Sequence, residues 1–191
     1  KKHLSEKTEL NDVTDEYCVF GVFGPKSRLL MQKLSKDDFS NENFKFATSK
    51  FITIDEKRIW AQRLSYVGEL GYELYVKSSN AKDIYKKIIE VGKNFNISNC
   101  GMHALDTMRM ESGFLHWGHD MSPEENQYQA GLDFTISFKK QIDFIGKEAL
   151  EKIKNKKPNT RFAMFSLKEN IPGIPLLLHD EPIYLDNEII G

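Results

Sequence analysis

Arg58–Val76, with the sequence RIWAQRLSYVGELGYELYV, places two runs rich in aromatic and β-branched residues around a short segment with two glycines. Glycine permits the positive φ angles of a chain reversal, and the flanking runs suit a pleated surface, so the pattern predicts a β-hairpin. Side chains alternate between the two faces of a strand. We therefore expect the second run to put Tyr72, Leu74 and Val76 on one face, and Glu73 with its neighbour at 75 on the other.

Glu73 is a carboxylate in the middle of an otherwise apolar strand, and its presence needs a physical reason. Water could solvate it on an exposed face, or it could accept hydrogen bonds from a specific partner. The hairpin pattern is compatible with both interpretations, and both stay open on this stretch alone.

The composition limits the class of protein. A chain of 191 residues, 40% of them hydrophobic, can bury one large core or two small ones. The formal net charge of −1 gives no general electrostatic support for nucleic-acid binding. The mean hydropathy is −0.50, and no apolar run approaches the roughly 20 residues of a membrane span, so we expect no membrane partner.

The two cysteines and the histidines predict neither a disulfide nor a metal site. Cys18 lies in an apolar run and Cys100 precedes a glycine, so we expect one buried thiol and one loop thiol, as in a reducing compartment. His116 and His119 are three residues apart but have no neighbouring ligands with zinc spacing.

Strands and helices interleave along the chain without a strict βαβ rhythm, which predicts an α+β fold with mostly antiparallel pairing. The nearly continuous apolar run at 16–23 is typical of a strand covered on both faces. The other expected strands are at 46–54, 131–138 and 161–167, with a final hairpin at 182–191; the expected helices are at 25–34, 80–95, 101–112 and 146–153.

The expected helix at 101–112 carries an arginine with two possible roles. Met102, Leu105 and Met108 share the predicted core face, and Arg109 projects beside it. Arg109 could form a weak surface pair with Asp106, worth about 0.3–0.5 kcal/mol. Alternatively, its guanidinium could stand at the edge of a pocket and bind a planar anionic ligand with two parallel hydrogen bonds.

Composition shifts predict three parts. Residues 1–56 form part of one α+β subdomain (strand, helix, strand), and residues 57–155 form a second α+β subdomain with the Tyr66–Glu73 hairpin. A charged segment without periodicity at 151–159 reads as a linker. Residues 156–191 are expected to begin a C-terminal β-barrel-like module that is truncated at its end.

Several stretches together resemble the glycine cleavage T-protein (aminomethyltransferase)-like folate-binding family. Residues 66–73 (YVGELGYE) are similar to its Tyr-x-Gly-Glu-x-Gly-aromatic-Glu signature. Residues 101–113 (GMHALDTMRMESG) resemble its Gly-x3-(Arg/Leu)-Asp-(Ser/Thr)-Leu-Arg-Leu-Glu-x-Gly helix. His116–Asp120 (HWGHD) is similar to the Trp-Gly-x-Asp segment in the C-terminal folate half of dimethylglycine and sarcosine dehydrogenases, and the resemblance covers nearly the whole chain.

The resemblance implies a T-protein-like fold, with mostly antiparallel sheets and packed helices, plus the start of a C-terminal β module. It also implies roles for four residues. Tyr66 would pack on or hydrogen-bond the pterin of tetrahydrofolate, and Glu73 would accept hydrogen bonds from the pterin's amino and ring N–H groups. Arg109 would meet the anionic p-aminobenzoyl-glutamate end, and Trp117 would line the pocket.

No residue of this chain is assigned a catalytic role. The family's catalytic aspartate lies upstream of the strand that corresponds to 16–23, in a segment that we expect this chain to lack. Asp12 and Asp15 match the turn before that strand, and neither is promoted to that role. We therefore expect a fragment of a folate-dependent aminomethyltransferase or amine dehydrogenase, without its acid–base residue.

The resemblance further implies tetrahydrofolate-dependent one-carbon transfer from a small amine-derived donor. FAD would belong only to a missing upstream domain, and an upstream flavin domain or a lipoyl carrier protein would be the protein partner. The implied location is the bacterial cytoplasm or the mitochondrial matrix. Two alternatives remain: a non-catalytic folate-binding or assembly protein on the same fold, and a folate-dependent demethylase acting on a sulfonium compound.

Overall fold

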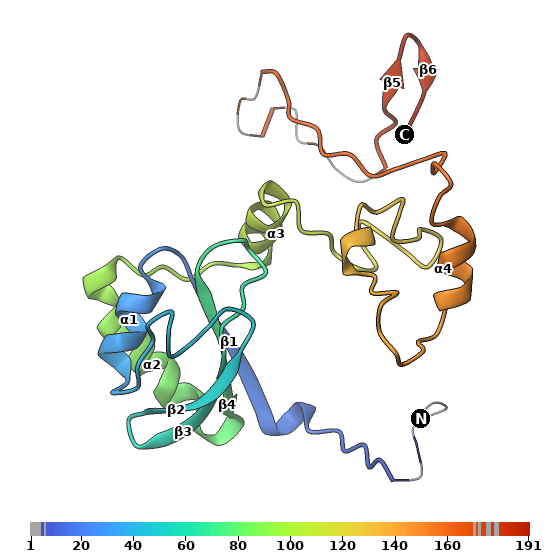
Figure 1. Cartoon of the computed structure of the whole chain (residues 1–191). Helices are drawn as coiled ribbons and strands as arrows, with labels where there is room; N and C mark the ends of the chain where they lie inside the picture. The colour runs from blue at the N-terminus through green and yellow to red at the C-terminus, as the bar shows by residue number, and fades with distance from the viewer. Residues whose placement is uncertain (1–4, 6, 170, 172, 175–176, 178–179) are drawn as a thin grey trace. The chain divides into compact units, whose positions relative to one another are not determined.

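The chain divides into two compact units, Lys1–Asp120 and Met121–Gly191, and each is described separately here. The computed structural model (Figure 1) describes residues 5, 7–169, 171, 173–174, 177 and 180–191. The first unit contains the four-stranded sheet and three of the helices, and it holds all four residues that the sequence predicts to bind a ligand.

The first unit is built on one antiparallel sheet with the strand order β1-β4-β3-β2. The strands are β1 (Tyr17–Phe23), β2 (Ser49–Ile54), β3 (Lys57–Gln62) and β4 (Gly71–Lys77). The predicted hairpin is therefore confirmed as β3 and β4, with Trp60 opposite Tyr75 and Gln62 opposite Glu73. Its connection, residues 63–70, is longer than a tight turn.

The two glycines of the hairpin are required for different physical reasons. Gly68 has a φ of +76° and supplies the positive φ that the connection needs. Gly71 already belongs to β4, and a Cβ there would lie 2.3 Å from the Phe23 ring on the neighbouring strand. Only Gly68 therefore serves the chain reversal, whereas Gly71 allows close packing.

One face of the sheet is covered by two helices, α1 (Ser27–Leu34) and α2 (Ala81–Gly92), which lie side by side (Figure 1). The predicted alternation in β4 is confirmed, because Tyr72, Leu74 and Val76 are buried on this face. The other fully buried large side chains of the core are Phe39, Phe44, Met31, Ile52, Ile54, Ile59, Val67 and Ile84.

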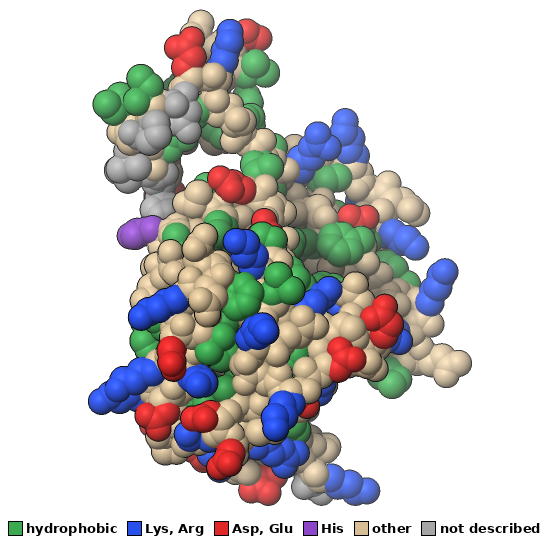
Figure 2. Space-filling view, turned by 90° about the vertical axis from the view of Figure 1, so that its left-hand side faces the viewer, with side chains coloured by type: hydrophobic (Ala, Val, Ile, Leu, Met, Phe, Trp, Pro, Cys, Tyr) green, Lys and Arg blue, Asp and Glu red, His purple; other side chains and the backbone are tan. Residues whose placement is uncertain are grey.

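The opposite face of the sheet is open, so the expectation that β1 is covered on both faces is wrong. Cys18, Phe20 and Val22 face the helices, whereas Tyr17 and Val19 are 38% and 50% exposed. The continuous apolar run misled the prediction because an antiparallel sheet can carry helices on one side only. Apolar side chains also reach the surface between charged ones in Figure 2.

Helix α3 (Met102–Glu111) confirms the predicted helix, but of its predicted core face only Leu105 and Met108 are even partly buried. Met102 is 67% exposed, and the only buried residue of the helix is Arg109. The charged groups around Arg109, described below, hold this side of the helix and replace an apolar stripe. Gly113, with a φ of +71°, follows the end of α3, as the sequence predicts.

The second unit contains little regular structure. Helix α4 (Lys147–Ile153) and a hairpin of β5 (Tyr184–Leu185) and β6 (Glu188–Ile189) confirm two predictions. The strands predicted at 131–138 and 161–167 are absent from the described residues. The first is replaced by local turns and the 3-10 helix Asp133–Thr135, and the amide of Phe162 in the second segment donates to Gln129 instead of to a ladder.

The predicted boundaries differ from these two units. The boundary at 56/57 falls in the turn between β2 and β3, inside the single sheet of the first unit. The three-part division of the sequence stays a prediction, and the boundary in the structure follows Asp120.

Candidate functional site

Tyr66 is held in the connection between β3 and β4 by the segment that follows α3. Its hydroxyl donates to the carbonyl of Leu115 at 3.1 Å. Its ring stacks against Phe114, with centroids 6.4 Å apart, and meets the edge of the His116 ring at 6.1 Å. Burial raises the pKa of Tyr66, although the positive charge of Arg109 opposes this, so the phenol is protonated at neutral pH.

The same two segments are joined at a second point. The hydroxyl of Ser112, the residue after α3, donates to the carbonyl of Val67 at 2.9 Å. Gly68 makes this approach possible, because a Cβ there would lie 2.2 Å from Ser112 Oγ. The order of the Tyr66–Gly68 segment therefore depends on the C-terminal end of α3.

Glu73 lies on the open face of β4 and is only partly buried. The hydroxyl of Tyr75 donates to Glu73 Oε2 at 3.0 Å. Within the described part of the chain, no other group forms a hydrogen bond with this carboxylate. On β1, the residue opposite Glu73 is Gly21, which adds no side chain beside it. Most of the acceptor capacity of the carboxylate is therefore available to a ligand.

Tyr66 and Glu73 line the same cavity, which follows the edge strand β1 and has a volume of about 870 Å³. A volume of this size is typical of small-molecule sites. Its walls come from β1, α1, α2, the β3–β4 connection and α3; they include Gly21, Phe23, Ser27, Tyr85, Ile88, Phe95, Leu105 and Met108. We call it the Glu73 cavity.

Arg109 is 4% exposed and is surrounded by acceptors of the protein itself. Both of its terminal nitrogens bind the Asp120 carboxylate, one of them at 3.2 Å, and its Nε donates to Asp106 at 3.2 Å. The carbonyl of Phe114 accepts a further bond at 3.2 Å. Of the five guanidinium N–H groups, four therefore have partners among the described residues.

Asp120 closes the loop that carries Trp117. Besides the Arg109 pair, its carboxylate accepts a bond from the amide of His116 at 2.7 Å. Burial opposes ionisation of this carboxyl, but the hydrogen bonds from Arg109 and His116 outweigh it and hold the pKa of Asp120 below its ordinary value. The ionised pair thus fixes residues 114–120 against α3.

Trp117 itself is 61% exposed and does not line the Glu73 cavity. Arg109 does not line it either, although Arg109 is close enough to Tyr66 to influence its pKa. The structure therefore places the four predicted residues as two pairs: Tyr66 and Glu73 on the cavity, and Arg109 and Trp117 in the helix and loop that support Tyr66.

Two residues of this arrangement have no role in the sequence-based prediction. Asp120 is the partner of Arg109, and its only sequence signal is its place at the end of the unusual segment at 116–120. Tyr75 is the partner of Glu73, and the signal for it is the two-residue alternation that puts both on the same face.

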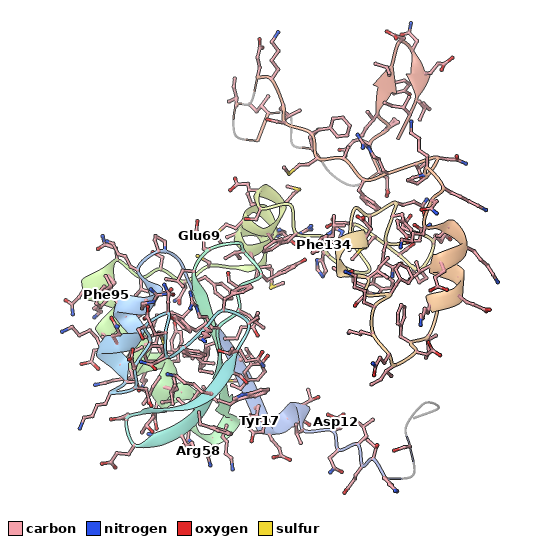
Figure 3. All side chains as sticks on the ribbon, in the orientation of Figure 1. Asp12, Tyr17, Arg58, Glu69, Phe95 and Phe134 are labelled. Atoms are coloured by element: carbon pink, nitrogen blue, oxygen red, sulfur yellow. The ribbon has the colours of Figure 1, made fainter. Side chains whose placement is uncertain are left out.

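A second hollow lies at the other end of the open face. It has a volume of about 1410 Å³, and its walls include Tyr17, Phe51, Arg58, Trp60 and Tyr75, together with residues 10–14. In Figure 3, Tyr17 and Arg58 lie at the end of the first unit away from Glu69. We call this the Trp60 groove; Tyr75 lies between it and the Glu73 cavity.

The remaining features add no further site. Among the described residues, no group of three or more His, Cys, Asp or Glu side chains is arranged to hold a metal ion. Cys18 and Cys100 are both free, the first partly buried and the second exposed. In the part of the chain that the structure describes, none of the helices is long and apolar enough to cross a membrane.

Comparison with known proteins agrees with the resemblance seen in the sequence. Residues 1–140 match the GCVT N-terminal domain family. Dimethylglycine dehydrogenase of Rattus norvegicus, a mitochondrial protein, is 40% identical over 159 residues, which are 83% of this chain and 19% of that protein. An aminomethyltransferase of Alkaliphilus metalliredigens is 31% identical over 191 residues, which are 100% of this chain and 50% of that protein.

The fold is also shared with a solved structure. The glycine cleavage system aminomethyltransferase T of Bartonella henselae superposes with a TM-score of 0.62 and 21% identity, over 74% of this chain and 37% of that chain. This confirms the α+β class with an antiparallel sheet. The chain spans about a fifth of the dehydrogenase and half of the aminomethyltransferase it matches. Because the family match covers 1–140 of its 191 residues, the chain belongs to the GCVT N-terminal domain family.

Proposed function

We infer that this chain is the folate-binding part of a protein that carries out tetrahydrofolate-dependent one-carbon transfer, of the dimethylglycine or sarcosine dehydrogenase type or of the aminomethyltransferase type. The observation that carries the proposal is that Tyr66 and Glu73 line one cavity of suitable size. Membership of the family supports the same ligand.

The chemistry of Glu73 fits the pterin. The 2-amino group and the adjacent ring N–H of a pterin form two parallel donors, and an ionised carboxylate accepts such a pair strongly. Glu73 offers this acceptor on a strand whose backbone is fixed by pairing on both sides, opposite Gly21 and Gln62. A rigid sheet is a better support for such a contact than a loop.

The other residues would act from the α3 side. Tyr66 would present its ring to the pterin while its hydroxyl stays bonded to Leu115. Arg109 and Trp117 do not line the cavity, so their proposed contacts, of Arg109 with the anionic p-aminobenzoyl-glutamate end and of Trp117 with the ligand, would require the ligand to extend from the cavity toward α3 and its following loop. Bound tetrahydrofolate would supply the secondary amine that accepts the one-carbon unit. The contribution of this chain is to bind and orient that ligand.

The one-carbon donor, the protein partner and the cellular location are likewise proposed from the relatives. The one-carbon donor would be a small amine-derived compound, the protein partner a flavin domain or a lipoyl carrier, and the location the bacterial cytoplasm or the mitochondrial matrix. FAD would bind such a flavin domain and not this chain.

Isothermal titration of the chain with tetrahydrofolate under anaerobic conditions tests the proposal. Glu73→Gln replaces an acceptor by a donor at one oxygen position, and should weaken binding by about tenfold to a hundredfold, since charged hydrogen bonds contribute roughly 1.5–3 kcal/mol. Glu90→Gln is the matched control, because Glu90 is an exposed residue of α2 outside the cavity. Equal affinity of the Glu73→Gln variant and the wild type would sink the proposal.

A further inference from the structure

Glu73 and Tyr75 form a pair on the open face of the sheet. They are two residues apart on β4, so their side chains project on the same side. Glu73 lies opposite Gly21 and Gln62, whereas Tyr75 lies opposite Val19 and Trp60. The carboxylate therefore has no cross-strand side chain beside it on β1, whereas the phenol lies between the apolar side chains of Val19 and Trp60.

The hydrogen bond between them engages only part of the carboxylate. The Tyr75 hydroxyl donates to Oε2 at 3.0 Å, and Oε1 has no hydrogen-bond partner among the residues the structure describes. An ionised carboxylate has about four acceptor positions, of which this bond uses one. The contact can thus orient Glu73 without competing with a ligand that needs both oxygens.

Tyr75 is itself held in place. Its ring packs on Trp60 with centroids 4.7 Å apart and planes 40° apart, and Trp60 pairs across the sheet with Phe51. The Arg58 guanidinium covers the Phe51 ring at 3.7 Å. Burial, and then the hydrogen bond to Glu73, raise the pKa of Tyr75, so the hydroxyl keeps its proton and donates at neutral pH.

We propose that Tyr75 is a positioning residue for the ligand-binding carboxylate: stacked on Trp60, it fixes the orientation of Glu73 so that the remaining acceptor positions face the Glu73 cavity. A free glutamate side chain samples several rotamers, and ordering it on binding lowers affinity. Tyr75 orders the Glu73 side chain before the ligand binds. The identity of the ligand rests on the function proposed above, but the contact itself does not.

Tyr75→Phe removes the hydroxyl and keeps the ring on Trp60. We expect it to weaken tetrahydrofolate binding by about tenfold, the size of one hydrogen bond to a charged group. Binding of p-aminobenzoyl-glutamate, which lacks the pterin, should change less than twofold. Tyr17→Phe is the control, because Tyr17 also lies on the open face and none of the described groups forms a hydrogen bond with its phenol.

The contact can be tested without any ligand through the pKa of Tyr75, followed by NMR of tyrosine labelled with 13C at Cζ. Glu73→Gln removes the negative charge and the charged acceptor, so the pKa of Tyr75 should fall toward its ordinary value. Burial still raises the pKa of Tyr75 in both the wild type and Glu73→Gln, so the fall should be partial.

The outcomes separate the two proposals. If Glu73→Gln weakens binding and Tyr75→Phe does not, the positioning role is wrong and the folate site stands. If neither substitution affects binding but Glu73→Gln lowers the pKa of Tyr75, the pair exists and the folate site is wrong. An unchanged pKa of Tyr75 in Glu73→Gln overturns the inference directly, as does an equal loss of affinity for both ligands in Tyr75→Phe.

Discussion

Asp120→Asn tests whether the Arg109 pair holds the loop that carries Trp117. The Arg109 side chain is 5% exposed and that of Asp120 is 24% exposed, so the substitution leaves a buried guanidinium with less compensation. Breaking one partner of a buried pair costs about 3–5 kcal/mol. Asp106 remains 3.2 Å from Arg109, and asparagine keeps one acceptor oxygen at this position. We therefore expect a loss of about 2 kcal/mol in the free energy of unfolding.

Urea unfolding at pH 7, followed by circular dichroism, measures this loss. Asp83→Asn is the matched control: Asp83 pairs with Lys57 at 3.9 Å, but its side chain is 64% exposed. Exposed pairs of this kind contribute about 0–1 kcal/mol, so the control should lose much less.

The pH dependence of the free energy of unfolding gives a second, independent test of this pair. The pKa of Asp120 is lower in the folded protein than its ordinary value near 3.9, so its contribution is fully present above that value. It disappears as the pH falls through the folded pKa. The difference between wild type and Asp120→Asn should therefore be constant near pH 7 and shrink below about pH 4. A loss under about 0.5 kcal/mol at pH 7, or a difference that persists unchanged in acid, would refute the role given to this pair.

Three further substitutions test other contacts. Gly68→Ala should destabilise the protein by about 1–3 kcal/mol in urea, because φ is +76° and the Cβ would meet Ser112; an unchanged midpoint would show that this approach is not tight. Tyr72→Phe should stabilise by about 1 kcal/mol, because the buried Tyr72 hydroxyl has no hydrogen-bond partner among the described residues; a loss of stability would reveal a missing partner. Tyr66→Phe should cost about 1 kcal/mol through the lost bond to Leu115, and no loss in thermal unfolding would contradict it.

Much of the secondary structure of the first unit can be predicted from the sequence, because it depends on residue patterns within single strands and helices. The alternation from Tyr72 to Val76 assigns the buried face of β4 correctly, and the helix predicted at 80–95 forms as α2, with Ile84 and Ile88 buried. The predicted core face of α3 is wrong at Met102 for a different reason. Apolar spacing selects Met102, whereas the structure buries Arg109, whose charge is neutralised by a residue outside the helix.

The same limit applies to the site. The motif at 66–73 locates Tyr66 and Glu73, and both line one cavity. The supporting contacts depend on side chains brought together by tertiary structure, as Asp120 is with Arg109, and a spacing rule within one element cannot predict them. The apolar runs at 131–138 and 161–167 predict strands that fail to form because their backbone groups bond locally or to a turn.

The proposed function requires the Glu73 cavity to bind the pterin of a reduced folate. An NMR titration of the 15N-labelled chain with tetrahydrofolate locates the ligand most directly, because each amide reports on its own surroundings. Binding in the Glu73 cavity should give saturable shifts concentrated at Gly21, Tyr66 and Glu73, and these shifts should be lost at the same ligand concentration in Glu73→Gln. Saturable shifts confined to the Trp60 groove or to the second unit, with those three amides unmoved, would contradict it.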